Sequence, residues 1–222
     1  APLDAAGALL WNPASITGLE TSEFVIGAEF LYLDTNVGST VAPNALGPNT
    51  PPVTLSGETR SDSGVGILPT VAVAFRNEDS PWTFGLGLFS VGGFSMNLPA
   101  SPLTPPTNPI FSGRSVYSKL AVLQVVPTAA LQLTDRLSLG LAPTISIADA
   151  VLDPNLWATP NPDRSNPSAT HTRTNWGLGF QVGVYYETEN CWHFGASYKS
   201  PQWLEEFTFY SEDSDGNPRT DR

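Results

Sequence analysis

Groups that could act as nucleophiles, general bases or metal ligands are few and scattered in this chain of 222 residues. His171 follows Pro167 in a turn-rich stretch and His193 precedes an alternating run, but neither has a Ser/His/Asp spacing or a ligand cluster around it. Cys191 is the only cysteine, which excludes an intrachain disulfide and a cysteine-based metal site. We predict no enzyme, no metal site and no cofactor; a barrel protease or phospholipase, with its site assembled from distant strands, is the enzymatic alternative.

The basic side chains offer a different chemistry, the binding of a carboxylate. Arg114 and Arg173 lie at the ends of long loops on the phase assigned below to the inner face, and Lys199 has the same phase with Ser197 beside it. A cation on such a wall can pair with the acidic head group of a ligand, and arginine can do so through two parallel hydrogen bonds. The alternative for each cation is an internal salt bridge, for example with Glu29.

The composition favours strands and turns. Only 14% of the residues are charged and 10% are aromatic, with 19 Gly and 21 Pro, so good helix formers are scarce. A net charge of -11 and scattered Lys and Arg exclude a nucleic-acid partner, which needs clustered positive charge. No apolar run is long enough for a membrane helix, and no signal peptide is present at the start of this chain. A transmembrane β-barrel is not excluded by either observation.

Alternation with period two is the dominant pattern. From Asn175 to Tyr186 every even position is large and apolar, while most odd positions are Gly, Asn or Gln. Comparable stretches bring the predicted total to seven antiparallel strands. The other six are Glu23–Leu33, Gly64–Arg76, Trp82–Gly92, Val116–Leu133, Arg136–Ala150 and Cys191–Phe209.

The connections alternate strictly between long and short. Residues 36–63, 94–114 and 152–172 form long connections, whereas 77–81, 134–135 and 188–190 are short. A meander of this kind has all its tight turns at one end and all its long loops at the other. This asymmetry is typical of outer-membrane barrels, which have short periplasmic turns and long extracellular loops.

The two faces of the predicted strands differ in side-chain size rather than in charge. Leu137, Leu139 and Leu141 share one face of their strand, opposite Ser138 and Gly140. A soluble sandwich would need charged residues outside, and the small-residue face offers few. We assign the large face to lipid and the small face to a plug or a narrow lumen; the alternative is a soluble β-protein with weakly charged strands. Lys119 has the outward phase near the loop end, where lipid head groups lie.

Two features resist a simple barrel. Pro69, Pro127 and Pro143 fall inside strand patterns, so we expect bulges or kinks at these positions. Seven is also an odd number, whereas bacterial single-chain barrels have an even number of strands. Either this count misses a strand or the chain is truncated.

Four stretches in order resemble the FadL/TodX-type outer-membrane transporters of long-chain fatty acids and other hydrophobic compounds. The resemblance covers nearly the whole chain, and the last stretch is the most specific. The stretches are Leu10-Trp11-Asn12-Pro13-Ala14-Ser15, the start of the strand at Trp82, the pair 127–130 with 137–140, and 176–180 leading to 195–201.

The resemblance implies an all-β fold, a transmembrane antiparallel barrel with about seven of an expected fourteen strands present. It implies an N-terminal hatch, or plug, over residues 1–19, followed by barrel strands and loops over 20–222. Asn12, Pro13 and Ala14 would form the gate in this hatch, because this tripeptide suits neither a helix nor a strand. The alternative for this tripeptide is an ordinary turn into the first strand.

The resemblance further implies a bacterial outer-membrane location and passive uptake of long-chain fatty acids or other hydrophobic molecules, such as aromatic hydrocarbons. Membrane lipid is the other implied partner. The alternative is a non-selective, porin-like or structural barrel. Gly92 and Gly93 are the candidate kink for a lateral exit, although two glycines could also just end the strand. Apolar residues in the following long connection suggest ligand binding, or a loop folded on itself. These residues are Phe94, Met96, Leu98, Leu103, Ile110 and Phe111.

Overall fold

The computed structural model describes residues 4–45, 47–49, 52–101, 115–162, 165–169, 171–172, 174–190, 192–213 and 215–221. Two short helices precede a series of strands. Among these residues no helix has the length and apolar character needed to cross a bilayer. The elements are α1 (Ala5–Trp11), the 3-10 helix η1 (Pro13–Gly18), β1 (Glu23–Tyr32), β2 (Asn36–Val41), β3 (Leu55–Arg60), β4 (Val65–Arg76), β5 (Trp82–Leu98), β6 (Val116–Gln132), β7 (Leu137–Asp153), β8 (His171–Thr172), β9 (Asn175–Glu187), β10 (His193–Lys199), β11 (Trp203–Leu204), β12 (Phe209–Glu212) and β13 (Pro218–Asp221).

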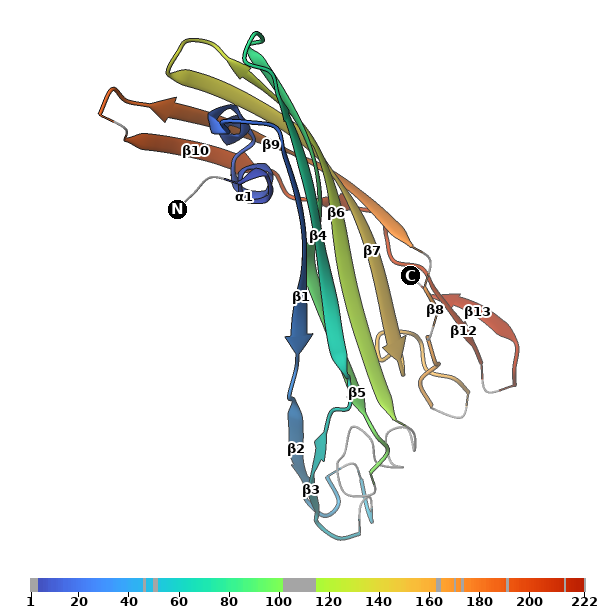
Figure 1. Cartoon of the computed structure of the whole chain (residues 1–222). Helices are drawn as coiled ribbons and strands as arrows, with labels where there is room; N and C mark the ends of the chain where they lie inside the picture. The colour runs from blue at the N-terminus through green and yellow to red at the C-terminus, as the bar shows by residue number, and fades with distance from the viewer. Residues whose placement is uncertain are drawn as a thin grey trace.

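One curved antiparallel sheet dominates the fold, in the order β1-β4-β5-β6-β7-β9-β10, and β11 also pairs with β9 (Figure 1). All seven predicted strands are present, but β5 and β7 extend beyond their predicted ends and the last strand is interrupted. The range Cys191–Phe209 is divided into β10 and β11, because the register with β9 shifts by one residue between Lys199, opposite Gln181, and Trp203, opposite Leu178. Ser200 and Pro201 lie in this interruption.

The long connections contain regular structure that the sequence pattern did not reveal. The range 36–63, predicted as a loop, contains the β2–β3 hairpin, in which Asn36 is opposite Arg60. The strand β12 pairs with β8 and β13 to form a separate three-stranded sheet. Both additions lie at the end of the molecule opposite α1 (Figure 1). The tight turns therefore lie at one end of the sheet and the long connections at the other.

The prolines act differently from the prediction. Pro127 of β6 and Pro143 of β7 cause no shift in register: the β6–β7 pairing stops at Val125–Ile145 and resumes at Ala129–Leu141 with the same offset. The expectation of bulges at these two prolines was wrong. Each proline keeps its partner on the other side, Leu86 and Phe180 respectively. The interruption is therefore confined to the β6–β7 pair.

The small-residue face is the inner, concave face, and α1 and η1 pack on it. Leu9 and Ile16 of the helices are fully buried, together with Ala74, Ala130 and Ala142 of the wall. The large side chains of the strands point to the other face and are exposed, for example Phe84 at 53% and Leu141 at 54%. The main hydrophobic core therefore lies between the helices and the wall, and the outer face forms a continuous apolar surface.

Candidate functional site

The N-terminal helices, which we call the plug (residues 4–18), are built around Asn12. Asp4 caps α1 by accepting a hydrogen bond from the Gly7 amide at 2.5 Å, and the Asn12 amide donates to the Ala8 carbonyl at its end. The Asn12 side chain then caps η1 through the Ala14 amide at 3.1 Å. Pro13 occupies the first position of η1, where its missing N–H costs nothing. The sequence interpretation that Pro13 lies in no helix was wrong.

Glycines of the wall let the plug approach the strands. A Cβ atom on Gly183 would overlap Asn12 Oδ1, and one on Gly140 would overlap the backbone of Pro13 and Ala14. A Cβ on Gly85 would lie 2.6 Å from a methyl group of Leu9. These three glycines belong to β9, β7 and β5, and β6 lies between β5 and β7 in the sheet. We call Gly85, Gly140 and Gly183 the glycine seat.

Hydrogen bonds with residues of β7, β9 and β10 hold the plug on the wall. Asn12 Nδ2 donates to the Val184 carbonyl at 3.0 Å. The Trp11 carbonyl accepts from Gln181 Nε2 at 2.8 Å and from Ser197 Oγ at 2.7 Å. Thr17 Oγ1 donates to Ser138 Oγ at 2.8 Å. The plug is therefore held by directional bonds as well as by packing, and all of them reach it from strand residues near the short turns.

A polar cluster continues along the inner face beyond the plug. Lys199 Nζ donates to Gln124 Oε1 at 2.6 Å, and Gln124 Nε2 donates to Ser146 Oγ at 3.1 Å. Ser146 Oγ donates in turn to Gln202 Oε1 at 2.9 Å. Within the described chain Lys199 forms no salt bridge, so the predicted alternative of a bond to Glu29 is not observed. Its ammonium keeps donors for a further partner.

A β-bulge in β5 changes which face its last residues occupy. Ser90 is opposite Leu123 of β6 and Gly92 is opposite Val122, so Val91 is an extra residue. Phe94 consequently lies opposite Leu120, whose other partner is Ala150 of the inner face. If Val91 took a regular place in the ladder, Phe94 would share the outward phase of Leu86 and Leu88. The bulge therefore turns Phe94, Met96 and Leu98 inward.

The prediction that Phe94, Met96 and Leu98 lie in a long loop was wrong, because β5 continues through Gly92 and Gly93 to Leu98. Glycines remove side chains without ending a strand when a neighbour still supplies backbone partners. Here β6 supplies them as far as Val116.

The wall opens beside the bulge. Pairing of β4 with β5 ends at Thr70 opposite Phe89, and beyond this point β4 pairs with β1 and β5 with β6. The strands are joined again at the loop end, where the Asp62 amide donates to the Asn97 carbonyl at 2.7 Å. A cleft of about 380 Å³ lies between these two limits. We call it the wall cleft; it is lined mainly by Leu31, Val65, Ile67, Leu68, Phe94 and Leu120.

A second hollow lies at the loop end of the sheet, over about 480 Å³. It is lined by Trp157, Phe207 and Phe209, and the last two rings stack with their centroids 6.3 Å apart. Glu206 and Asp221 contribute carboxylates, of which Asp221 is paired with Arg219 at 2.7 Å. We call this hollow the mouth pocket. Its chemistry is aromatic and acidic.

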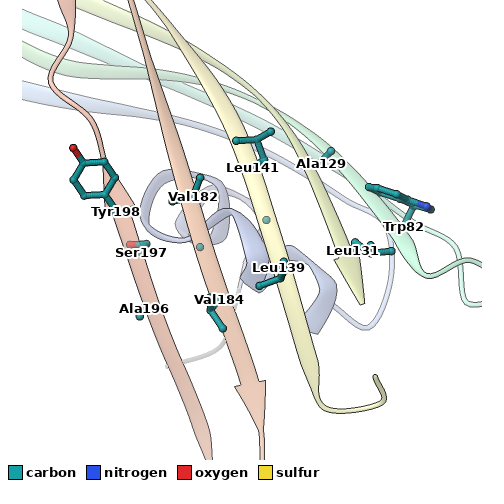
Figure 2. Close-up of a pocket in the computed structure, with 12 residues that line it drawn as sticks. Trp82, Ala129, Leu131, Leu139, Leu141, Val182, Val184, Ala196, Ser197 and Tyr198 are labelled. Atoms are coloured by element: carbon teal, nitrogen blue, oxygen red, sulfur yellow. The ribbon is translucent and has the colours of Figure 1, made fainter. Parts of the chain in front are cut away.

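An apolar hollow of about 660 Å³ lies on the outer face (Figure 2). Leu139, Leu141, Val182 and Val184 project into it from β7 and β9, between Trp82 at one end and Tyr198 at the other (Figure 2). These side chains have the outward phase and pair with one another across the sheet, as Leu141 does with Val182. The hollow is part of the apolar outer surface.

Several predicted ligand-binding residues lie outside the described residues. They are Leu103, Ile110, Phe111, Arg114 and Arg173. Ser197 and Lys199 lie together on the inner face of β10, but their partners differ: Ser197 bonds to the plug and Lys199 to Gln124.

The sequence is similar to a known protein family over most of its length. Residues 1–206 match the family described as outer membrane protein transport protein (OMPP1/FadL/TodX). The chain belongs to the FadL/TodX family. Members of this family are outer-membrane β-barrels that act as transport channels and not as enzymes. The comparison with curated proteins finds no match.

Solved FadL/TodX structures share the fold. The Ralstonia pickettii toluene transporter TbuX is 18% identical, with a TM-score of 0.63 over 97% of this chain and 58% of its own. The Pseudomonas putida toluene transporter TodX is 16% identical, with a TM-score of 0.63 over 97% of this chain and 56% of its own. A Pseudomonas aeruginosa FadL homologue is 18% identical, with a TM-score of 0.57 over 95% of this chain and 48% of its own. The chain thus spans about half the length of these structures and corresponds to part of the family's barrel.

The sequence prediction missed two kinds of inner-face residue in this FadL/TodX chain. Gln124 bonds to Lys199 and Gln181 to the plug, and the inward phase of both could have indicated them. Gln202 extends the cluster by accepting from Ser146 Oγ. Arg76 also faces inward and donates to Thr83 Oγ1 at 3.1 Å and to Gln132 Oε1 at 3.2 Å. It was overlooked because it ends its strand beside a short turn, a position typical of solvated charge.

Proposed function

We propose that this chain forms part of an outer-membrane channel for the passive uptake of hydrophobic compounds that carry an acidic head group, such as long-chain fatty acids. The observation that carries the proposal is Lys199. Its ammonium reaches the inner face beside the plug, bonds to a neutral amide oxygen and has no carboxylate partner among the described residues. A fatty-acid carboxylate would supply the missing charge and replace water at the ammonium.

Lys199 also lies next to a residue that bonds to the plug. It is opposite Gln181 in the β10–β9 ladder, and Gln181 Nε2 donates to the carbonyl of Trp11. A carboxylate on Lys199 would therefore lie next to the bonds that fasten α1. In this account Asn12, Pro13 and Ala14 form the gate, because they rest directly on the glycine seat.

The wall cleft supplies the exit in this proposal. A hydrophobic tail would pass from Phe94 and Leu120 on the inner face to Val65 and Ile67 on the outer face without entering water. Gly92 and Gly93 adjoin the bulge that opens this route. Closure of the lumen by the plug would then favour the lateral path over the axial one.

Neutral aromatic compounds are a second candidate substrate class, and the mouth pocket favours them. Trp157, Phe207 and Phe209 provide aromatic surface, while the carboxylate of Glu206 would repel another carboxylate. The mouth pocket thus favours neutral aromatic compounds, whereas Lys199 favours acids. The ligand class can be tested by comparing the two directly.

The test is equilibrium binding to the complete barrel in detergent, measured by displacement of a fluorescent fatty acid. Oleate, oleyl alcohol and toluene are compared in the wild type and in Lys199→Met. We expect oleate to bind best and to lose about tenfold in affinity in Lys199→Met, because a charge-assisted bond is removed. The alcohol should be unaffected, and Arg136→Met, a cation paired with Glu189 at the short-turn end, is the control.

Three results would contradict the proposal in different ways. Stronger binding of toluene than of oleate would establish the aromatic class. Equal loss of oleate and alcohol affinity in Lys199→Met would mean that the lysine is structural. Absence of saturable binding of every compound would favour a porin-like or structural barrel.

A further inference from the structure

The wall cleft has one charged residue among the side chains that line it in the described structure, Lys119 of β6. The inner lining of the cleft includes Leu120, while Lys119 and its partner across the ladder, Ser95, have the outward phase. The cleft therefore joins an apolar inner opening to an outer opening that carries an ammonium group. The proposed uptake route does not involve this charge.

Lys119 lies at the level where the apolar outer surface ends. On β7 the outward residues are apolar or proline from Leu137 to Ile147, and the next outward residue is Asp149. This apolar stretch matches the roughly 9–11 residues that a transmembrane strand needs. On β6, Ala121 is opposite Asp149, and Lys119 is the next outward residue toward the long loops. Lys119 is thus at the depth of the head groups in the leaflet that faces the long loops.

The ammonium of Lys119 is only loosely held. Its single described ion pair is with Asp149, at 3.9 Å, and the two side chains are 43% and 45% exposed. Exposed pairs at such distances are weak, so another anion can compete for the lysine. Asp149 would at the same time repel that anion. Removal of Lys119 and removal of Asp149 should therefore have opposite effects on binding of the anion at this opening.

We infer that Lys119 receives the anionic head group of a departing amphiphile at the outer opening of the wall cleft. The tail then enters the acyl region beside Val65 and Ile67 while the head group stays at the interface. This inference rests on the proposed function and adds a second cation to it. Lys199 holds the acid inside the lumen, and Lys119 sets the ease with which an ionised acid leaves.

The test uses the complete barrel in phosphatidylcholine vesicles, loaded with a fluorescent long-chain acid, and follows its transfer into the bilayer. We expect Lys119→Met to slow transfer of the ionised acid about threefold, the size typical of an exposed charge pair. Asp149→Asn should speed it, because a competing carboxylate is removed. Transfer of the matching fluorescent alcohol should be unchanged in both variants.

Controls separate this inference from the function on which it rests. Affinity for the acid, measured in detergent, should be unchanged in Lys119→Met, and Arg136→Gln at the opposite end should alter neither quantity. Folding is checked by the gel shift between unheated and heated protein. Normal binding with unchanged transfer in Lys119→Met would overturn the inference alone, whereas absent binding in the wild type would overturn the proposed function.

Two further outcomes would also reject it. If Lys119→Met and Asp149→Asn slow transfer equally, the pair only supports the wall. If the effect of Lys119→Met appears only in vesicles that contain phosphatidylglycerol, the lysine binds membrane lipid and not the transported acid.

Discussion

Asn12 of the plug rests on Gly183 of β9, so closely that a methyl group at position 183 would overlap its Oδ1 atom. The same asparagine donates to the carbonyl of Val184, the next residue. Backbone contact of this kind is possible only where the wall has no side chain. The contact makes the plug and the wall interdependent, and it explains why the inner face needs glycine at a position where a soluble sheet would place a larger residue.

Gly183→Ala should loosen the plug. The added methyl group must displace Asn12, and overpacking of this kind costs about 1–3 kcal/mol. We expect higher ion conductance of the complete barrel in planar bilayers, together with a lower unfolding temperature. Gly92→Ala is the matched control, since nothing lies within 4 Å of its added Cβ. Equal conductance in the two variants would mean that the glycine seat does not close the lumen.

Deletion of Val91 should remove the bulge but leave the faces of the last part of β5 unchanged, because Gly92 then follows Ser90 in regular alternation. Deletion of both Val91 and Gly92 should turn position 94 outward, to the phase of Leu86 and Leu88. The measurement is tryptophan fluorescence of Phe94→Trp in vesicles of brominated lipid, which quenches only residues exposed to acyl chains. We expect weak quenching with both residues present and after deletion of Val91 alone, and strong quenching after deletion of both residues. Deletion of Ala100, beyond the end of β5, should leave quenching weak.

Glu206→Gln should speed the capture of acids. Removing a carboxylate from the mouth pocket lowers the repulsion of an approaching anion, so we expect an association rate for oleate about twofold higher at low ionic strength. The difference should vanish at high salt, where charges separated by more than a Debye length are screened. Stopped-flow mixing measures both rates. An equal gain for oleyl alcohol would show that the effect is not electrostatic.

The turn between β12 and β13 should open in acid. The side chain and the amide of Asn217 donate to the Asp213 carboxylate, and these bonds lower the pKa of Asp213. A lowered pKa means that the stabilisation is complete above the ordinary aspartate value of about 3.9 and is lost as the pH falls through the folded-state value. Amide exchange at Asp215 and Asn217 should therefore accelerate only below that range. Asp213→Asn should remove this pH dependence.

The sequence predicted the strands well because their alternation has a direct physical cause. Large residues face lipid and small residues face the plug, so Leu137 and Ser138 differ in type for the same reason that they differ in position. The inward phase of Ser197 and Lys199 followed from this alternation. Period-two reasoning fails, however, wherever a single extra residue is inserted.

The bulge at Val91 is such an insertion, and it accounts for the main error. Phe94, Met96 and Leu98 continue an alternating pattern, but Gly92-Gly93 looked like the end of a strand. Only the pairing partners on β6 reveal that the strand continues in a shifted phase. The bonds from Gln181 and Gln124 were equally beyond the sequence, because both join residues far apart in the chain.

The most direct test of the lateral route is to fill the wall cleft. A Cβ on Gly93 would meet its nearest atoms at ordinary distances, 3.5 Å from the Leu120 carbonyl and 3.7 Å from a Leu68 methyl group, so Gly93→Trp can place its ring in the cleft. Transfer of a fluorescent fatty acid from the complete barrel to vesicles is compared in Gly93→Trp and Gly92→Ala, with binding measured in parallel. We expect binding to persist in both variants and transfer to fall about tenfold or more in Gly93→Trp alone. A tenfold loss corresponds to a barrier for transfer that is higher by about 1.4 kcal/mol. Unchanged transfer with the cleft filled would contradict exit through the wall.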